Sequence, residues 1–166
     1  MAWLAPHLHQ GRYLTRDLIL AATTEPEHET EKDDATPSIF KAVEALTKGI
    51  EVPLPHGHAF LDKDDRRRTR VRLRWWDDQA TTFRTAAMLP AEERAALPDT
   101  PIPAHARLGA VQAPVFFGHY WLVGDITLQS PRCACVDYSA GKGGSLVAYR
   151  FDGETELSAE KFVWVP

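Results

Sequence analysis

The residues of this chain that could do chemistry centre on a glycine–histidine pair, Gly118-His119, which directly follows an apolar run. Residues 115–117 combine β-branched and aromatic side chains, and this predicts a short strand buried on both faces. His119 would then stand at the tip of the strand, where α/β and α+β proteins often place ligands and catalytic groups. An imidazole there can coordinate a divalent metal ion, and it can equally be a half-buried histidine in a turn.

Three other stretches carry residue types that are used in catalysis or binding. His56 and His58 have the His-x-His spacing of many metal sites, but only Asp62 lies nearby as a further ligand, which favours loop histidines. Residues 141–144, Gly-Lys-Gly-Gly, suggest a phosphate cradle but lack the Lys-Ser/Thr ending and the following helix of a P-loop. They are more typical of a tight strand connection. Asp137 is expected to accept hydrogen bonds from backbone amides.

Arginine is concentrated in residues 66–74, where six of the nine residues are arginine and two tryptophans follow. The alternating sequence predicts the second arm of a β-hairpin over residues 60–76, with its turn at 62–66. Apolar side chains would lie on one face and arginines on the other. The basic face could bind a phosphate backbone, but the alternation favours a solvated or acid-paired strand face. The formal net charge of −4 does not indicate a nucleic-acid binder.

The elements expected in the first two thirds of the chain belong to a single domain over residues 1–166. Helical spacing predicts two short helices within 2–22. An amphipathic helix is predicted from the Thr-Pro start at 36 to its glycine stop at 49. Residues 23–36 are expected to be an acidic loop, since their apolar content is minimal. Residues 78–107 are expected to be a proline-rich connecting segment that crosses the sheet.

The last third is expected to be mainly strands. A strand over 133–138 follows the Gly-His strand, and a glycine turn leads to a strand over 144–151. The Asp152-Gly153 pair predicts a tight hairpin turn into a final strand over 155–165. Together with the helices, including one predicted over 90–97, these strands predict an α+β fold.

The composition is that of an ordinary globular chain, with 44% hydrophobic and 25% charged residues. No apolar run approaches the roughly 20 residues that span a bilayer, so no membrane partner is expected. The first residues lack the features of a signal sequence, which favours a cytoplasmic location. Cys133 and Cys135 share one face of a predicted strand, so we expect free, structural cysteines.

The order of these features resembles the C-terminal half of the calcineurin-like metallophosphoesterases, which include bacterial phosphoprotein phosphatases and diadenosine tetraphosphatases. In residues 114–165 a Gly-His pair ends one strand, Asp137 ends the next, and a glycine turn leads to Leu-Val-Ala-Tyr-Arg at 146–150. Residues 1–77 are also similar to one bacterial branch, notably at Lys48-Gly49, Leu54-Pro55 and Arg74-Trp75-Trp76. The resemblance implies the C-terminal half of a β-sandwich flanked by helices. It implies that His119 is a metal ligand and that Tyr120 stands at the substrate-binding mouth.

The resemblance further implies two divalent metal ions, of Mn, Fe or Zn, and a phosphorylated substrate. The family's N-terminal ligand motifs, Gly-Asp-x-His-Gly, Gly-Asp-x-x-Asp-Arg-Gly and Gly-Asn-His-Glu/Asp, are absent from the sequence. The chain supplies one recognisable ligand, so it is expected to be inactive without an N-terminal half. Two alternatives stay open. One is a non-catalytic relic that pairs with a partner or with itself through a sheet edge. The other is a basic-hairpin module for a polyanion, centred on residues 66–76.

Overall fold

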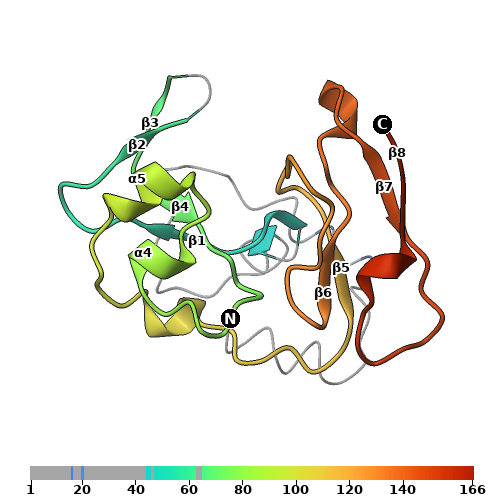
Figure 1. The fold of residues 1–166 in the computed structure, drawn as a ribbon. Coiled ribbons are helices and arrows are strands. Elements are labelled where there is room, and N and C mark those ends of the chain that lie inside the picture. Colours follow the sequence, from blue (N-terminus) through green and yellow to red (C-terminus); the bar gives the residue numbers. More distant parts are fainter. Residues whose placement is uncertain (1–15, 17–19, 21–43, 46, 63–64) are drawn as a thin grey trace.

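The structure, a computed structural model, describes residues 16, 20, 44–45, 47–62 and 65–166. Within them the chain is a mixed α+β protein of small two-stranded sheets and short helices (Figure 1). The expected acidic loop at 23–36 lies outside the described residues, as do most of the helices expected before residue 44. Residues 44, 45, 47 and 48 are helical, and the predicted stop at Gly49 is confirmed by its left-handed φ of 83°.

The predicted hairpin is present, but its second arm contributes strands to two different sheets. Strand β2 (Phe60–Leu61) pairs antiparallel with β3 (Arg67–Arg68), across a turn in which the Asp62 amide donates to the Arg66 carbonyl at 2.9 Å. The chain then continues as β4 (Arg70–Arg72), which pairs antiparallel with β1 (Glu51–Pro53). The predicted apolar face of this arm is buried at Val71 and Leu73, each 1% exposed.

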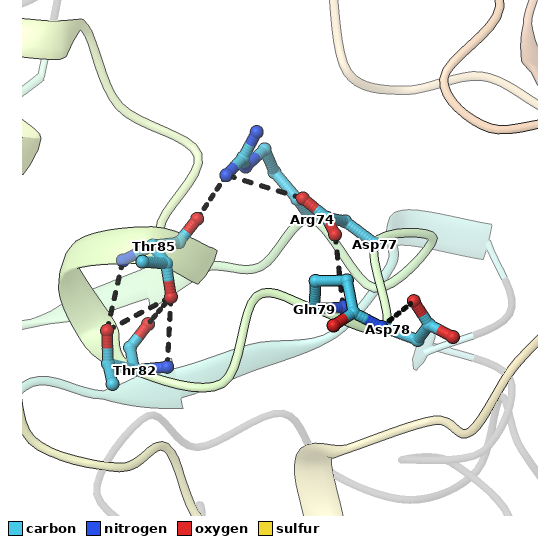
Figure 2. Close-up of polar contacts among 6 residues, drawn as sticks. All are labelled: Arg74, Asp77, Asp78, Gln79, Thr82 and Thr85. Carbon is cyan, nitrogen blue, oxygen red and sulfur yellow. Dashed lines mark hydrogen bonds and ion pairs between the residues drawn. The ribbon is translucent and has the colours of Figure 1, made fainter.

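The segment that follows β4 packs onto the β1–β4 pair. It contains α4 (Phe83–Ala86), α5 (Ala91–Ala95) and the short 3-10 helix η2 (Ala104–Ala106). Helix α4, which the sequence analysis missed, begins at Thr82, whose hydroxyl accepts the Thr85 amide while the Thr85 hydroxyl accepts the Thr82 amide (Figure 2). The first hydrophobic core joins this segment to β1 and β4, and its buried members are Ile50, Val52, Leu54, Val71, Leu73, Ala80, Phe83, Ala86, Ala87, Leu97, Ile102 and Ala106.

The remaining strands form the other side of the molecule (Figure 1). Strand β5 (Val115–Phe117) pairs parallel with β6 (Cys133–Cys135), and an isolated bridge joins Asp137 to Leu146 at the start of β7 (Leu146–Tyr149). Strand β8 (Phe162–Val165) pairs antiparallel with β7. A second core forms beneath these strands, and its buried members are Ala134, Tyr138, Val147, Leu157 and Phe162.

Two predictions about this side need correction. Strand β5 is not covered on both faces, because Phe116 is 39% exposed and contacts Tyr149 and Phe151 at the surface. The Asp152-Gly153 pair does not form a tight hairpin turn, because β7 and β8 are joined by the longer connection 150–161, which includes the 3-10 helix η4 (Ala159–Lys161). The cysteine prediction is confirmed, since Cys133 and Cys135 are free and buried.

An aromatic cluster of Trp75, Trp76, Phe117 and Tyr120 connects the two sides. Trp76 stacks on Phe117 with ring centroids 4.9 Å apart, and it meets Tyr120 edge-on at 5.0 Å. Such pairs contribute about 0.5–1.5 kcal/mol each beyond the burial of their area. The cluster therefore holds the chain after β4 against the end of β5. None of the helices in the described part of the chain has the length and apolar character needed to cross a bilayer.

Candidate functional site at the ends of β5 and β6

The loop after β5 carries two non-glycine residues in left-handed backbone conformation, His119 at φ 69° and Trp121 at φ 47°. Bulky residues rarely adopt this conformation, which costs on the order of 1–3 kcal/mol per residue and is concentrated at functional sites. The positive φ lies on the histidine itself and not on the glycine that precedes it. His119 is exposed, and it stands where the parallel strands β5 and β6 both end.

Asp137 holds this loop in place, and the prediction that it accepts hydrogen bonds from backbone amides is confirmed. One carboxylate oxygen accepts the Trp121 amide at 3.4 Å and the other accepts the Ser139 amide at 3.1 Å. Its backbone carbonyl also accepts the Leu122 amide at 3.0 Å. Asp137, two residues after β6, therefore fixes the loop that follows β5, and it stabilises the strained conformation at Trp121 through a charged acceptor.

Tyr120 points its side chain into the protein. Its hydroxyl donates to the Leu73 carbonyl at 3.1 Å, and its ring lies within the aromatic cluster. A Cβ atom added at Gly49 would lie 2.1 Å from the Tyr120 hydroxyl oxygen, so glycine is required there for close approach as well as for its positive φ. Burial raises the pKa of Tyr120 above its ordinary value. The phenol is thus a neutral donor that fixes the loop to β4.

The electrostatic surroundings of His119 favour its neutral form. Partial desolvation lowers the pKa of the imidazole, the charges of Arg72 and Lys48 lower it further, and Asp137 opposes them. The pKa therefore lies below the ordinary value of about 6.5, which favours the uncharged imidazole at neutral pH. A neutral imidazole is the form that coordinates a metal ion.

A lysine that the sequence analysis did not connect with His119 also reaches this loop. Residues 141–144 form the expected tight connection, with the 3-10 helix η3 (Ala140–Lys142) and Gly143 at φ 83°. This turn places the Lys142 ammonium 3.8 Å from the centre of the Trp121 ring, a cation–π contact. The His119 and Trp121 ring centres are 6.5 Å apart. In the sequence, the glycines around Lys142 indicate a tight turn. Such a turn can bring the lysine close to a neighbouring loop, and this was the signal that could have linked Lys142 to the histidine loop.

The basic face of the predicted hairpin arm is exposed at Arg68 and half-buried from Arg70 to Arg74. Acidic partners are common on it, as expected for an acid-paired strand face. Arg68 pairs with Asp62 at 2.7 Å, and Arg70 pairs with Glu51 at 3.7 Å. Arg74 pairs with Asp77 at 3.6 Å and donates to the Thr85 carbonyl (Figure 2). A cavity of about 30 Å³ next to Arg74 has room for a water molecule but not for a substrate.

Metal-ligating residues do not gather into a complete site within the part of the chain that the structure describes. No group of three or more His, Cys, Asp or Glu side chains in these residues could hold an ion. His56 lies in a turn, and its carbonyl is 3.3 Å from the ring Nδ1 of His58. A metal pair needs several convergent ligands, and within the described residues His119 stands without two further His, Cys, Asp or Glu side chains beside it.

No family model, curated protein or solved structure matches the chain. A functional assignment therefore rests on the chemistry and geometry of its residues. The fold and the site define an α+β protein with an exposed histidine at the carboxyl ends of two parallel strands. A carboxylate and a half-buried tyrosine hold the loop that carries it.

Proposed function

We propose that this chain forms the C-terminal part of a metal-dependent phosphoesterase of the calcineurin-like type, with His119 as one ligand of a pair of Mn, Fe or Zn ions. The observation that carries the proposal is the placement of His119, exposed in left-handed conformation where β5 and β6 end. Such ions, when bound, activate a water molecule and polarise a phosphoryl oxygen. The substrate is a phosphate ester.

The surroundings of His119 support this role through the chain's own residues. Asp137 and Tyr120 hold the loop on two sides, so the imidazole is positioned before any ion binds. We assign Tyr120 to this positioning role rather than to the substrate mouth, because its hydroxyl is engaged by Leu73. Positive charge near the imidazole attracts a phosphate group. The remaining ligands belong to an N-terminal half that completes the β-sandwich, and the chain alone is inactive.

Hydrolysis of p-nitrophenyl phosphate with added Mn²⁺ tests the proposal on this chain and on a version extended upstream. We expect turnover by the extended version alone, and a loss of at least about 100-fold in kcat for its His119→Ala variant. His105→Ala, at an exposed histidine in η2, is the matched control and keeps full activity. Full activity in the His119→Ala variant would refute the ligand assignment. Turnover by the 166-residue chain alone would refute the dependence on an N-terminal half.

A second candidate, a non-catalytic module that associates through its sheet, draws support from β8. Val163, Trp164 and Val165 are 58%, 55% and 63% exposed, an unusual run of apolar surface at the end of a sheet. If the extended version does not turn over and the chain sediments as a dimer, this candidate replaces the first. The basic-hairpin alternative is disfavoured because acids already pair with Arg68, Arg70 and Arg74. Salt-dependent binding of single-stranded DNA would revive it.

A further inference from the structure

The arginines on the outer face of β4 differ in how their charge is satisfied. Arg70 approaches the Glu51 carboxylate at 3.7 Å and donates to the Glu51 carbonyl at 3.1 Å. Arg74, two residues beyond the end of β4, has Asp77 at 3.6 Å and donates to the Thr85 carbonyl. Between them, the Arg72 side chain forms no ion pair and no hydrogen bond with any residue in the described ranges. The Nε atoms of all three arginines are buried without a hydrogen-bond partner, so Arg72 differs from the other two by having no ion pair.

The position of Arg72 links β4 to the loop after β5. Its guanidinium carbon lies 5.7 Å from the centre of the Tyr120 ring, so the charge is stacked beside the residue that follows His119. Glu51 is directly opposite Arg72 in the strand register, but the ion pair of its carboxylate is with Arg70.

Arg72 is half-buried, and its guanidinium has no carboxylate partner among the described residues, so its charge is available to an external anion. A planar guanidinium matches the oxygens of a phosphoryl group in a bidentate contact. The histidine loop, which is fixed against β4 by the Tyr120–Leu73 hydrogen bond, brings a candidate metal ligand to the same place.

We propose that Arg72 binds the phosphoryl group of the substrate beside His119, as the anion-binding residue of this site. The assignment rests on the proposed function, since the phosphate ester is the substrate of that same site. Arg72 is distinguished from its neighbours on β4 by its missing acidic partner, and it is a substrate-binding residue rather than part of the metal centre.

Titration of the 166-residue chain with inorganic phosphate in the presence of EDTA tests this inference without relying on catalysis. Binding is followed by amide shifts in nitrogen–proton correlation spectra and by isothermal calorimetry. We expect saturable binding with shifts at Gly118 and His119, and a loss of at least about tenfold in affinity for Arg72→Gln, as removal of charged hydrogen bonds predicts. Arg70→Gln is the matched control, because it removes an arginine from the same face of β4, and it should bind phosphate within about twofold of the unsubstituted chain.

Circular dichroism and tryptophan emission check that each variant is folded. If Arg72→Gln does not fold, Arg72→Lys takes its place, and it should weaken phosphate binding severalfold because it loses the bidentate geometry. Phosphate affinity that is unchanged in the folded Arg72 variant, or an absence of saturable phosphate binding, overturns the inference. If phosphate binding depends on Arg72 but the extended version does not hydrolyse p-nitrophenyl phosphate, the proposed function is overturned. The assignment of Arg72 as an anion-binding residue is then still supported.

Discussion

The hydroxyl of Tyr120 donates a hydrogen bond to the backbone carbonyl of Leu73 at 3.1 Å, between residues 47 positions apart in the chain. Leu73 directly follows β4 and is buried in the first core, whereas Tyr120 follows the histidine at the end of β5. The same phenol lies against the α-carbon of Gly49. Three distant segments therefore meet at one side chain, and the position of His119 depends on all three.

Replacement of Tyr120 by Phe should destabilise the chain by about 1 kcal/mol, because it removes a partly buried hydrogen bond while keeping the ring. Tyr120→Ala should cost about 3–5 kcal/mol, since it also removes the ring from the aromatic cluster. Urea unfolding followed by tryptophan emission measures both changes, with Trp75 and Trp76 close to the site. A Phe variant with an unchanged urea midpoint would show that the hydrogen bond is not formed.

Substitution of Gly49 by Ala should be more damaging than the same change at another left-handed glycine. Gly57 has a φ of 85° and open space around its α-carbon, whereas a Cβ atom at Gly49 would collide with Tyr120. Gly57→Ala therefore isolates the backbone strain, about 1–2 kcal/mol. The difference between the losses of unfolding free energy in Gly49→Ala and Gly57→Ala then measures the cost of the steric clash with Tyr120. Equal losses in the two variants would contradict the close approach.

Removal of the Asp137 carboxylate should release the loop that carries His119. Asp137→Ala leaves the amides of Trp121 and Ser139 without their acceptor, and we expect a loss of about 2 kcal/mol. Faster hydrogen exchange at these two amides would localise the effect. Asp125→Ala, at an exposed aspartate in the segment between β5 and β6, is the control and should change neither stability nor exchange.

The acid stability of the chain should depend on Glu154. Desolvation raises the pKa of this carboxyl, but hydrogen bonds from backbone amides, Lys161 and Tyr149 outweigh it and hold the pKa at about 2. Since the unfolded-state value is near 4.3, this contribution is present above that pH and is lost as pH falls toward 2. Chemical unfolding measured across this range should show a steeper decline than in Glu154→Gln.

The control for this titration is Glu156→Gln, which removes a more exposed carboxylate from the same connection between β7 and β8. Its decline in stability between pH 5 and 2 should follow that of the unsubstituted chain. A Glu154→Gln variant with the same pH dependence as the unsubstituted chain would show that the network around Lys161 does not stabilise the fold.

The register of the β7–β8 pair can be tested with two valines. Val147 is 6% exposed and belongs to the second core, while Val163 is 58% exposed on the other face of the sheet. Val147→Ala should therefore cost about 2 kcal/mol, and Val163→Thr should stay within about 0.5 kcal/mol of the unsubstituted chain. A reversed order of the two urea midpoints would indicate a register shifted by one residue.

Sequence patterns anticipated the features that depend on local periodicity. The strict alternation after Asp62 predicted the hairpin arm and the burial of Val71 and Leu73, because side chains on a strand alternate between faces. Asp137 was assigned to backbone amides from its position after a strand, and it makes those contacts. The glycine stop of the helix at Gly49 follows from a conformation that glycine adopts without strain.

Features that depend on contacts between distant parts of the chain could not be predicted from local sequence patterns. The parallel pairing of β5 with β6 is long-range and involves short strands, so no local signal specifies it. The left-handed φ of His119 is sustained by the contacts of its neighbours, Tyr120 with Leu73 and Trp121 with Asp137, which the local sequence does not specify. The Asp-Gly turn signal was overridden because Lys161 bonds both Asp152 and Glu154 and so holds a longer connection.

The two cysteines of β6 give the molecule an internal reporter of its own opening. Both are fully buried, and burial raises the pKa of the Cys135 thiol to about 11. Thiol reagents attack the thiolate of an accessible cysteine, so the closed molecule resists modification. The rate at which a reagent labels Cys133 and Cys135 therefore measures how often β5 separates from β6. No dye or engineered residue is needed to follow the strand pair that carries the histidine loop.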